Sequence, residues 1–351
     1  MEINPRIPVM TQKSPYVETL RGFAILLVVM GHVIGDSVQG GMKVGDDSIW
    51  RYIYFNIDKL QMPLFTLIAG WVYAIRPFLK TQSFWRFAKQ KSQRVLIPML
   101  AVATIYYVLK AITGGEGGEQ LRKIWVLLVF PYNVYWYLPS LFWLFIIAGL
   151  LDKCRWLEKI GPWAVILLAS ILLYKYQEWL IPEAVPNIFS LKGAIYLLPF
   201  FLLGMGIRRF NAVWSEKRLV TGLWCLFITC MVLVQLVWFQ IIGDGYSSYG
   251  RNSWLGICTG LASAALFYSH VKIKALVWIG GFSYTIYLFH SIAKGICLQA
   301  LAKLGVGNLP TLFVCSVIAG VLIPVFIDQI LEKWKITRFV FLGKKQNKCL
   351  R

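Results

Sequence analysis

Apolar runs long enough to cross a bilayer recur from one end of this 351-residue chain to the other. A transmembrane helix needs about 20 mostly apolar residues. Only short charged or Gly/Pro-containing breaks separate the runs, and none is long enough to bury a core of its own. The pattern predicts a single all-α integral membrane domain over residues 1–351, with about ten transmembrane helices. The predicted spans cover residues 17–36, 57–79, 95–112, 131–151, 161–177, 193–207, 219–242, 253–271, 276–300 and 310–331.

The composition argues against a soluble protein. Hydrophobic residues make up 58% of the chain and charged residues only 15%, whereas soluble proteins contain roughly 25% charged residues. The net charge of +20 would indicate nucleic acid in a soluble domain. Here the basic residues flank the apolar runs, where they orient the chain and contact anionic lipid. We therefore expect membrane lipid, and not nucleic acid, as a partner.

The distribution of basic residues predicts the orientation of the chain in the membrane. With the N-terminus placed in the cytoplasm, the inner segments hold 23 Lys and Arg and the outer segments hold 9. Because short cytoplasmic loops carry the excess of basic residues, both termini are expected in the cytoplasm. The basic tail, about residues 332–351, is expected to lie against the inner lipid surface.

The first apolar run contains three ionisable residues, Glu18, Arg21 and His32. An ionisable residue at the centre of a membrane helix costs about 2.5–3.5 kcal/mol and usually has a function. The eleven positions from Arg21 to His32 make three helical turns plus roughly 20°, so the three residues share one stripe. The alternative is a Glu18–Arg21 pair that anchors the helix end, together with a packed histidine. We expect this run to be retained, because it lacks a small-residue cleavage site.

The stretch Glu18–His32 resembles the opening of the acyltransferase-3 superfamily, whose members carry Arg, ten residues and then His in their first helix. Further similar motifs follow in the family's order, and together they cover nearly the whole chain. They are Met62–Phe65 with Ala69–Trp71, Lys91 and Arg94 before Leu96–Pro98, Trp136–Phe142, Pro199–Gly204, and Ser283–His290. Two departures are Gln61, where relatives often have His, and Ala69, where they have Ser.

The resemblance implies a multi-pass enzyme of the bacterial inner membrane that O-acylates a surface glycan. The most similar branch contains fucose O-acetylases and intercellular-adhesin modification proteins. The implied donor is acyl-CoA, most simply acetyl-CoA, and the implied acceptor is a glycan or lipid-linked saccharide outside the cytoplasm. The alternative is a polysaccharide exporter. Transporters usually show internal repeats with matching interrupted helices, and the absence of such symmetry in this sequence favours the enzyme.

O-acylation requires a base that removes a proton from the attacking hydroxyl, and histidine is the commonest choice. The chain contains three histidines, His32, His270 and His290. His270 is expected at a cytoplasmic helix end, beside basic residues. His290 lies in the ninth predicted span, where we favour a structural role over a second polar group in the site. His32 is therefore the expected base, with Arg21 and Glu18 completing the catalytic set.

A coenzyme A donor requires cations for its phosphates, and Arg suits bidentate phosphate contact. Lys89, Lys91 and Arg94 lie at the cytoplasmic start of the third predicted span. The alternative for these three is ordinary positive-inside flanking. Asp58 and Lys59 are expected to pair with each other. No metal is expected, because the seven cysteines lie mostly inside apolar runs without metal-type spacing.

Overall fold

The structure, a computed structural model, describes residues 14–78, 83–113, 122–130, 132–182, 184–243 and 249–344. Within these ranges the secondary structure is helical and contains no strand. The helices of the first half are α1 (Pro15–Ile34), α2 (Ile49–Asp58), α3 (Gln61–Ile75), α4 (Phe84–Thr113), α6 (Val126–Val129), η1 (Asn133–Trp136), α7 (Tyr137–Lys153), α8 (Ile160–Lys175) and α9 (Gln177–Leu180). Those of the second half are η2 (Ile188–Ser190), α10 (Leu191–Arg209), α11 (Asn211–Trp214), α12 (Lys217–Trp238), α13 (Trp254–Ala262), η4 (Ser263–Tyr268), α14 (Lys274–Gly281), α15 (Ser283–Lys303), α16 (Leu309–Leu331) and α17 (Lys335–Leu342).

Seven helical segments of the described chain are long and apolar enough to cross a membrane, and two shorter apolar segments accompany them. The predicted all-α membrane fold is confirmed. The count of ten spans and the cytoplasmic side of the termini stay predictions. The seven are Pro15–Ile34, Phe84–Ile112, Val126–Lys153, Ile188–Arg209, Lys217–Trp238, Ser283–Lys303 and Leu309–Leu331, and the shorter two are Ile160–Lys175 and Trp254–Tyr268.

Several helix boundaries differ from the predicted spans. The run 57–79 is divided, because α2 ends at Asp58 and the 15-residue α3 starts at Gln61. The run 276–300 is divided at Phe282 into α14 and α15. Helix α4 begins at Phe84, well before the predicted residue 95. Hydropathy marks only where a helix is apolar, whereas a polar turn stays helical when one face of it is packed, as at the buried Phe87.

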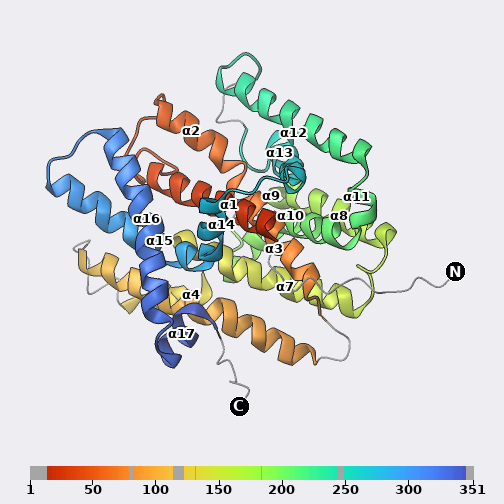
Figure 1. The fold of residues 1–351 in the computed structure, drawn as a ribbon, viewed down its shortest axis with the longest axis horizontal. Helices are drawn as coiled ribbons and strands as arrows, with labels where there is room; N and C mark the ends of the chain where they lie inside the picture. Colours follow the sequence, from red (N-terminus) through yellow and green to blue (C-terminus); the bar gives the residue numbers. More distant parts are fainter. Residues whose placement is uncertain are drawn as a thin grey trace.

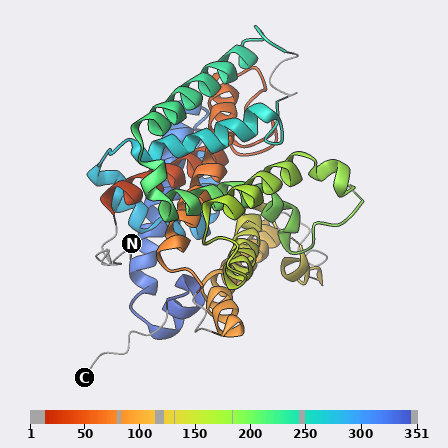
Figure 2. The ribbon, with the colours of Figure 1, turned by 90° about the vertical axis from the view of Figure 1, so that its right-hand side faces the viewer.

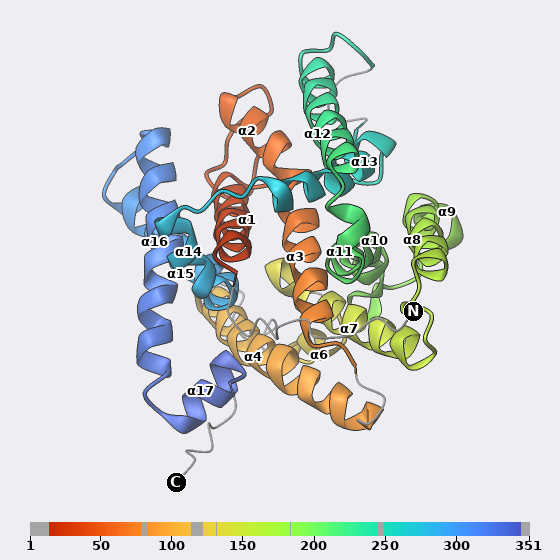
Figure 3. The same cartoon turned by 45° about the vertical axis from the view of Figure 1, so that its right-hand side comes forward.

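Helix α1 occupies the middle of the bundle and packs against α2, α3, α14, α15 and α16. Figure 1 shows it between α12 on one side and α4 on the other, and Figure 3 shows the same order from a second direction. Proline at the first position and an extended Ser14 start the helix, and Gly35 ends it at a φ of 92°. The central position of α1 buries most of its side chains inside protein, so its polar residues face other helices and not lipid.

Glycines allow the backbones of two pairs of helices to come into direct contact. A Cβ atom added at Gly204 of α10 would lie 1.9 Å from the Leu67 carbonyl oxygen of α3, and one added at Gly70 would lie 2.0 Å from that of Phe201. Gly22 of α1 meets α14 in the same way. Small residues at helix contacts are the usual means of close packing in membranes. These contacts fix α3 against α10 and α14 against α1 (Figure 2).

Candidate functional site

The predicted stripe on α1 has an ion pair at one end. Arg21 Nη1 donates a hydrogen bond of 2.7 Å to Glu18 Oε1. The Glu18 side chain is 7% exposed and that of Arg21 is 22% exposed, so the pair is largely enclosed by protein. Arg21 therefore has its charge compensated within its own helix, while part of its side chain remains exposed.

At the other end of the stripe, His32 meets a second histidine. Its ring stacks on that of His290, with 5.2 Å between the ring centroids and an angle of 29° between the planes. His290 lies on α15, which packs against α1, and its side chain is fully buried. The sequence favoured a structural role for His290 over a second polar group in the site, and the assignment of that role stays a prediction. The geometry places its ring beside that of His32.

The hydrogen bonds of His290 define its tautomer. Its Nδ1 lies 3.0 Å from the Ile286 carbonyl oxygen and 2.8 Å from that of Tyr287. Because both neighbours can only accept, Nδ1 carries the proton. In the neutral ring Nε2 is then an acceptor, and the Ser291 hydroxyl lies 3.3 Å from it. His290 is thus locked on its own helix and presents a fixed ring face to His32.

Lys294 is a third residue of this group, and the sequence prediction did not include it. It lies one turn after His290 on α15, and its Nζ donates a hydrogen bond of 2.5 Å to the His32 carbonyl oxygen. The available signal was a lysine inside an apolar run, four positions after a histidine. Residues at that spacing share one helix face, so His290 and Lys294 both face α1.

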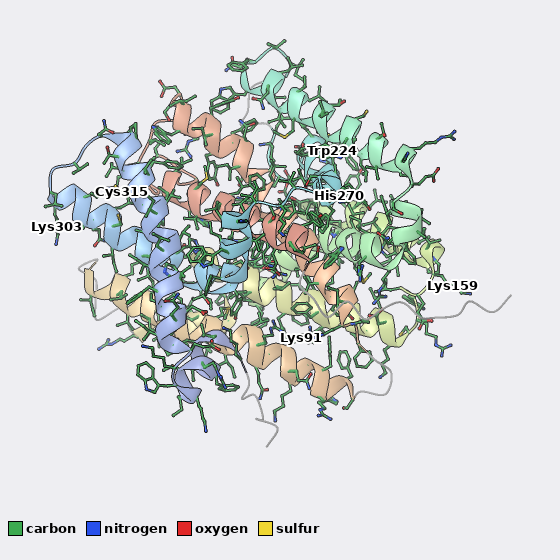
Figure 4. All side chains as sticks on the ribbon, in the orientation of Figure 1. Lys91, Lys159, Trp224, His270, Lys303 and Cys315 are labelled. Atoms are coloured by element: carbon green, nitrogen blue, oxygen red, sulfur yellow. The ribbon has the colours of Figure 1, made fainter. Side chains whose placement is uncertain are left out.

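The predicted cofactor-binding cations lie on α4 and differ in environment. Lys89 and Arg94 are exposed, whereas Lys91 is half-buried. The Lys91 ammonium lies 4.1 Å from the ring centroid of Phe145 and within 5.7 Å of those of Tyr73 and Phe87. Figure 4 shows Lys91 on this helix. Cation–π contacts therefore hold Lys91 in place, which leaves Arg94 and Lys89 as the more accessible cations.

Arg94 lies at the Arg21 end of α1. The charge of Arg94 acts on Arg21, and the Arg94 backbone carbonyl accepts a hydrogen bond of 2.8 Å from Tyr284 Oη of α15. The start of the tail also reaches this point, because a Cβ atom added at Gly343 would lie 2.5 Å from the Arg94 carbonyl oxygen. The predicted lipid-facing tail is therefore packed on α4 through α17 and Gly343, and residues 345–351 lie outside the described residues.

A polar cluster lies beyond the His32 end of α1. Arg251 Nε lies 2.9 Å and 3.1 Å from the two Asp58 carboxylate oxygens. The expected Asp58–Lys59 pair is therefore replaced by a pair with a residue from a distant loop. The Lys59 ammonium instead lies 3.3 Å from the ring centroid of Phe55. Arg251 is close enough to act on His32 electrostatically, so this pair belongs to the surroundings of the histidines.

Gln61, where relatives often have histidine, also faces α1. Its side chain is 3% exposed, and its Oε1 has no hydrogen-bond partner among the described residues. A Cβ atom added at Gly31 would lie 2.7 Å from this oxygen. The amide thus occupies space beside the backbone of the residue that precedes His32.

Surface hollows lie elsewhere. One of about 600 Å³ is lined by Leu172, Trp179 and neighbouring apolar residues of α8 and α9. Another of about 270 Å³ is lined by residues of α12, including Trp224 and Phe227. None of the six predicted site residues lines either hollow. Within the described residues, no group of three or more His, Cys, Asp or Glu is placed to hold a metal ion.

Comparison with protein families gives one match. The model of the acyltransferase-3 family, described as an acyltransferase domain, matches residues 14–328. The search of curated proteins gave no match, and the search of solved structures gave none. The match includes α1, with its Arg21–His32 spacing, and α15, which carries His290.

Proposed function

We propose a function from the premise that this chain belongs to the acyltransferase-3 family and is a membrane acyltransferase. In this proposal it is a multi-pass O-acyltransferase of the bacterial inner membrane. It transfers an acyl group, most simply acetyl, from cytoplasmic acyl-CoA to a hydroxyl of an extracytoplasmic glycan or lipid-linked saccharide. The observation that carries the proposal is the stacked His32–His290 pair inside the bundle, three helical turns from Arg21.

His32 serves as the general base in this reaction. The acceptor hydroxyl forms a bond to the thioester carbonyl carbon as its proton passes to the His32 imidazole. The C–S bond then breaks, and the coenzyme A thiolate leaves and takes up that proton. His290 acts as a positioning residue, because its hydrogen-bonded ring holds one face of the His32 ring. Holding a base in a productive orientation is a major part of what an active site contributes.

Arg21, Arg94 and Lys89 serve the donor end of the site. The rise along α1 separates positions 21 and 32 by roughly 16 Å. A donor whose phosphates lie near Arg94 would therefore extend its acyl arm along α1 toward His32. Glu18 holds Arg21 in place through their 2.7 Å hydrogen bond. Lys91, which the sequence prediction grouped with these cations, contributes through its packing between aromatic rings.

The experiment that tests this function uses a deletion strain complemented with the wild-type or the His32→Ala gene. Mass spectrometry of the surface glycan should show one added acyl group per modified sugar with the wild type and none with the variant. The added mass identifies the donor. An unmodified but normally exported glycan in the wild type would contradict the proposal, and loss of export in the deletion strain would favour a transporter.

A further inference from the structure

Lys294 differs from the other cations near His32 in its ionic surroundings. Arg251 is paired with Asp58, and Arg51 lies 3.3 Å from Asp46. Within the described chain, no Asp or Glu oxygen comes within ion-pair distance of Lys294, and Asp36 acts on it only from farther away. A cation inside an apolar helix is costly to insert. Its retention next to the histidine pair requires an explanation.

Helix capping explains part of the position of Lys294. The His32 carbonyl is among the last four of α1, which ends at Ile34, and such carbonyls lack partners within the helix. A lysine at a helix C-terminus also interacts favourably with the helix dipole. Capping uses one N–H group of the ammonium, however, and an ammonium has three. The bond to His32 is its only hydrogen bond to a described residue, so two donors remain.

Acyl transfer is accelerated by a hydrogen-bond donor or a positive group at this place. When a hydroxyl attacks a thioester, the carbonyl oxygen becomes an anion. Preorganised donors aimed at that oxygen typically contribute 10²–10³ in rate. The group must lie beside the base, because the base and the anion flank the same carbonyl carbon. The Lys294 ammonium donates a hydrogen bond to the His32 carbonyl oxygen, and Lys294 lies one helical turn from His290.

We propose that Lys294 is the catalytic cation that stabilises the oxyanion formed on the acyl-donor carbonyl, an inference that rests on the proposed function. The acceptor oxygen bonds to the carbonyl carbon while its proton goes to His32, and the carbonyl π electrons move to the oxygen that faces the Lys294 ammonium. When the carbonyl re-forms, the C–S bond breaks and the thiolate takes the proton from His32. Lys294 keeps its own proton throughout.

The test compares side chains that separate capping from charge. Lys294→Gln keeps an N–H donor for the His32 carbonyl but removes the charge, and Lys294→Arg keeps the charge. Lys303→Gln, at the exposed end of the same helix (Figure 4), is the matched control. Purified protein in nanodiscs is assayed with acetyl-CoA and surface glycan extracted from the deletion strain. The kcat, both KM values and the thermal unfolding temperature are measured for each variant.

We expect Lys294→Gln to lower kcat by about 10²–10³, with the KM for acetyl-CoA and the unfolding temperature close to those of the wild type. Lys294→Arg should retain much more activity, and Lys303→Gln should match the wild type. Lys294→Met provides a second uncharged side chain if the glutamine variant does not fold. Wild-type kcat in Lys294→Gln would overturn the inference, as would a change confined to the KM for glycan. An arginine variant as inactive as the glutamine variant would also overturn it. Absence of transfer by the wild type would instead contradict the proposed function itself.

Discussion

At the scale of single residues, the proposed reaction divides the work of one base between the two stacked histidines. His290 donates from Nδ1 to carbonyls of its own helix, so its ring cannot rotate without losing those bonds. Within the described part of the chain no hydrogen bond anchors the His32 ring, which is held by the contact with His290. A base held by stacking keeps both ring nitrogens available for proton transfer. This arrangement suits His32 for taking up a proton and returning it within one reaction cycle.

Replacement of His32 by alanine should therefore remove glycan acylation. Loss of a positioned base typically lowers the rate by 10²–10⁴, and the measurement is the acylated fraction of the glycan at equal protein level. His270→Ala is the matched control, because His270 is exposed at the far end of η4 and contacts Tyr16. More than about a tenth of wild-type activity in His32→Ala, well above this range, would place the base elsewhere.

Arg94 and Lys91 should respond differently to substitution by alanine. Arg94 is exposed, so Arg94→Ala should weaken acyl-CoA binding and reduce its dependence on salt. Lys91→Ala should instead lower thermal stability, because the Lys91 ammonium fills the space between three aromatic rings and such contacts contribute about 0.5–2 kcal/mol. Titration of acetyl-CoA at two salt concentrations distinguishes the two effects.

Arg86→Ala, exposed on the same helix, is the control for a general loss of positive charge. If Arg86→Ala and Arg94→Ala weaken binding equally, Arg94 contributes only to the general positive charge of α4 and is not a specific phosphate ligand. If binding and its salt response are unchanged in Arg94→Ala, Arg94 is only a topology determinant.

At the scale of helices, the tight contact between α3 and α10 determines where the buried side chains of both helices lie. The two backbones are in contact at Gly70 and Gly204. Gln61, the first residue of α3, packs against Gly31 of α1. Beyond its other end, Asp152 of α7 accepts two hydrogen bonds from Arg209 of α10 at 2.6 and 2.7 Å, and a third from Tyr73 of α3. A shift of α3 would therefore disturb both the Asp152–Arg209 ion pair, through Tyr73, and the position of Gln61 beside Gly31.

Gly204→Ala should destabilise the protein, because the added methyl group would lie 1.9 Å from the Leu67 carbonyl oxygen. Overpacking of this kind typically costs about 1–3 kcal/mol. Gly222→Ala on α12 is the matched control, since its added Cβ meets nothing within 4 Å and alanine favours helix by about 1 kcal/mol. Thermal unfolding in detergent measures both variants. Equal unfolding temperatures for the two variants would show that α3 and α10 are not held by backbone contact.

At the scale of the whole molecule, hydropathy was sufficient to predict the helical membrane fold, and helix geometry was sufficient to predict that Arg21 and His32 share one stripe of the first helix. Both depend only on local sequence and on helix geometry. Contacts between distant helices could not be predicted in this way. His290 and Lys294 reach His32 only because α15 packs on α1, and Asp58 pairs with Arg251 through a remote loop. The three aromatic rings around Lys91 also come from different helices, α3, α4 and α7.

In the proposed function, the orientation of the bundle determines which end of α1 meets cytoplasmic acyl-CoA. Figure 4 shows Lys303 and Lys159 toward opposite ends of the molecule, and the distribution of basic residues predicts them on opposite sides of the membrane. Fusions of a periplasm-active phosphatase and a cytoplasm-active fluorescent protein after residues 47, 159, 307 and 351 measure the sides directly. The first and third fusions should be outside and the other two inside, because the inner segments hold 23 of the flanking basic residues and the outer ones 9. The reverse pattern would put Arg94 on the side without acyl-CoA and would exclude the donor site at that end of α1.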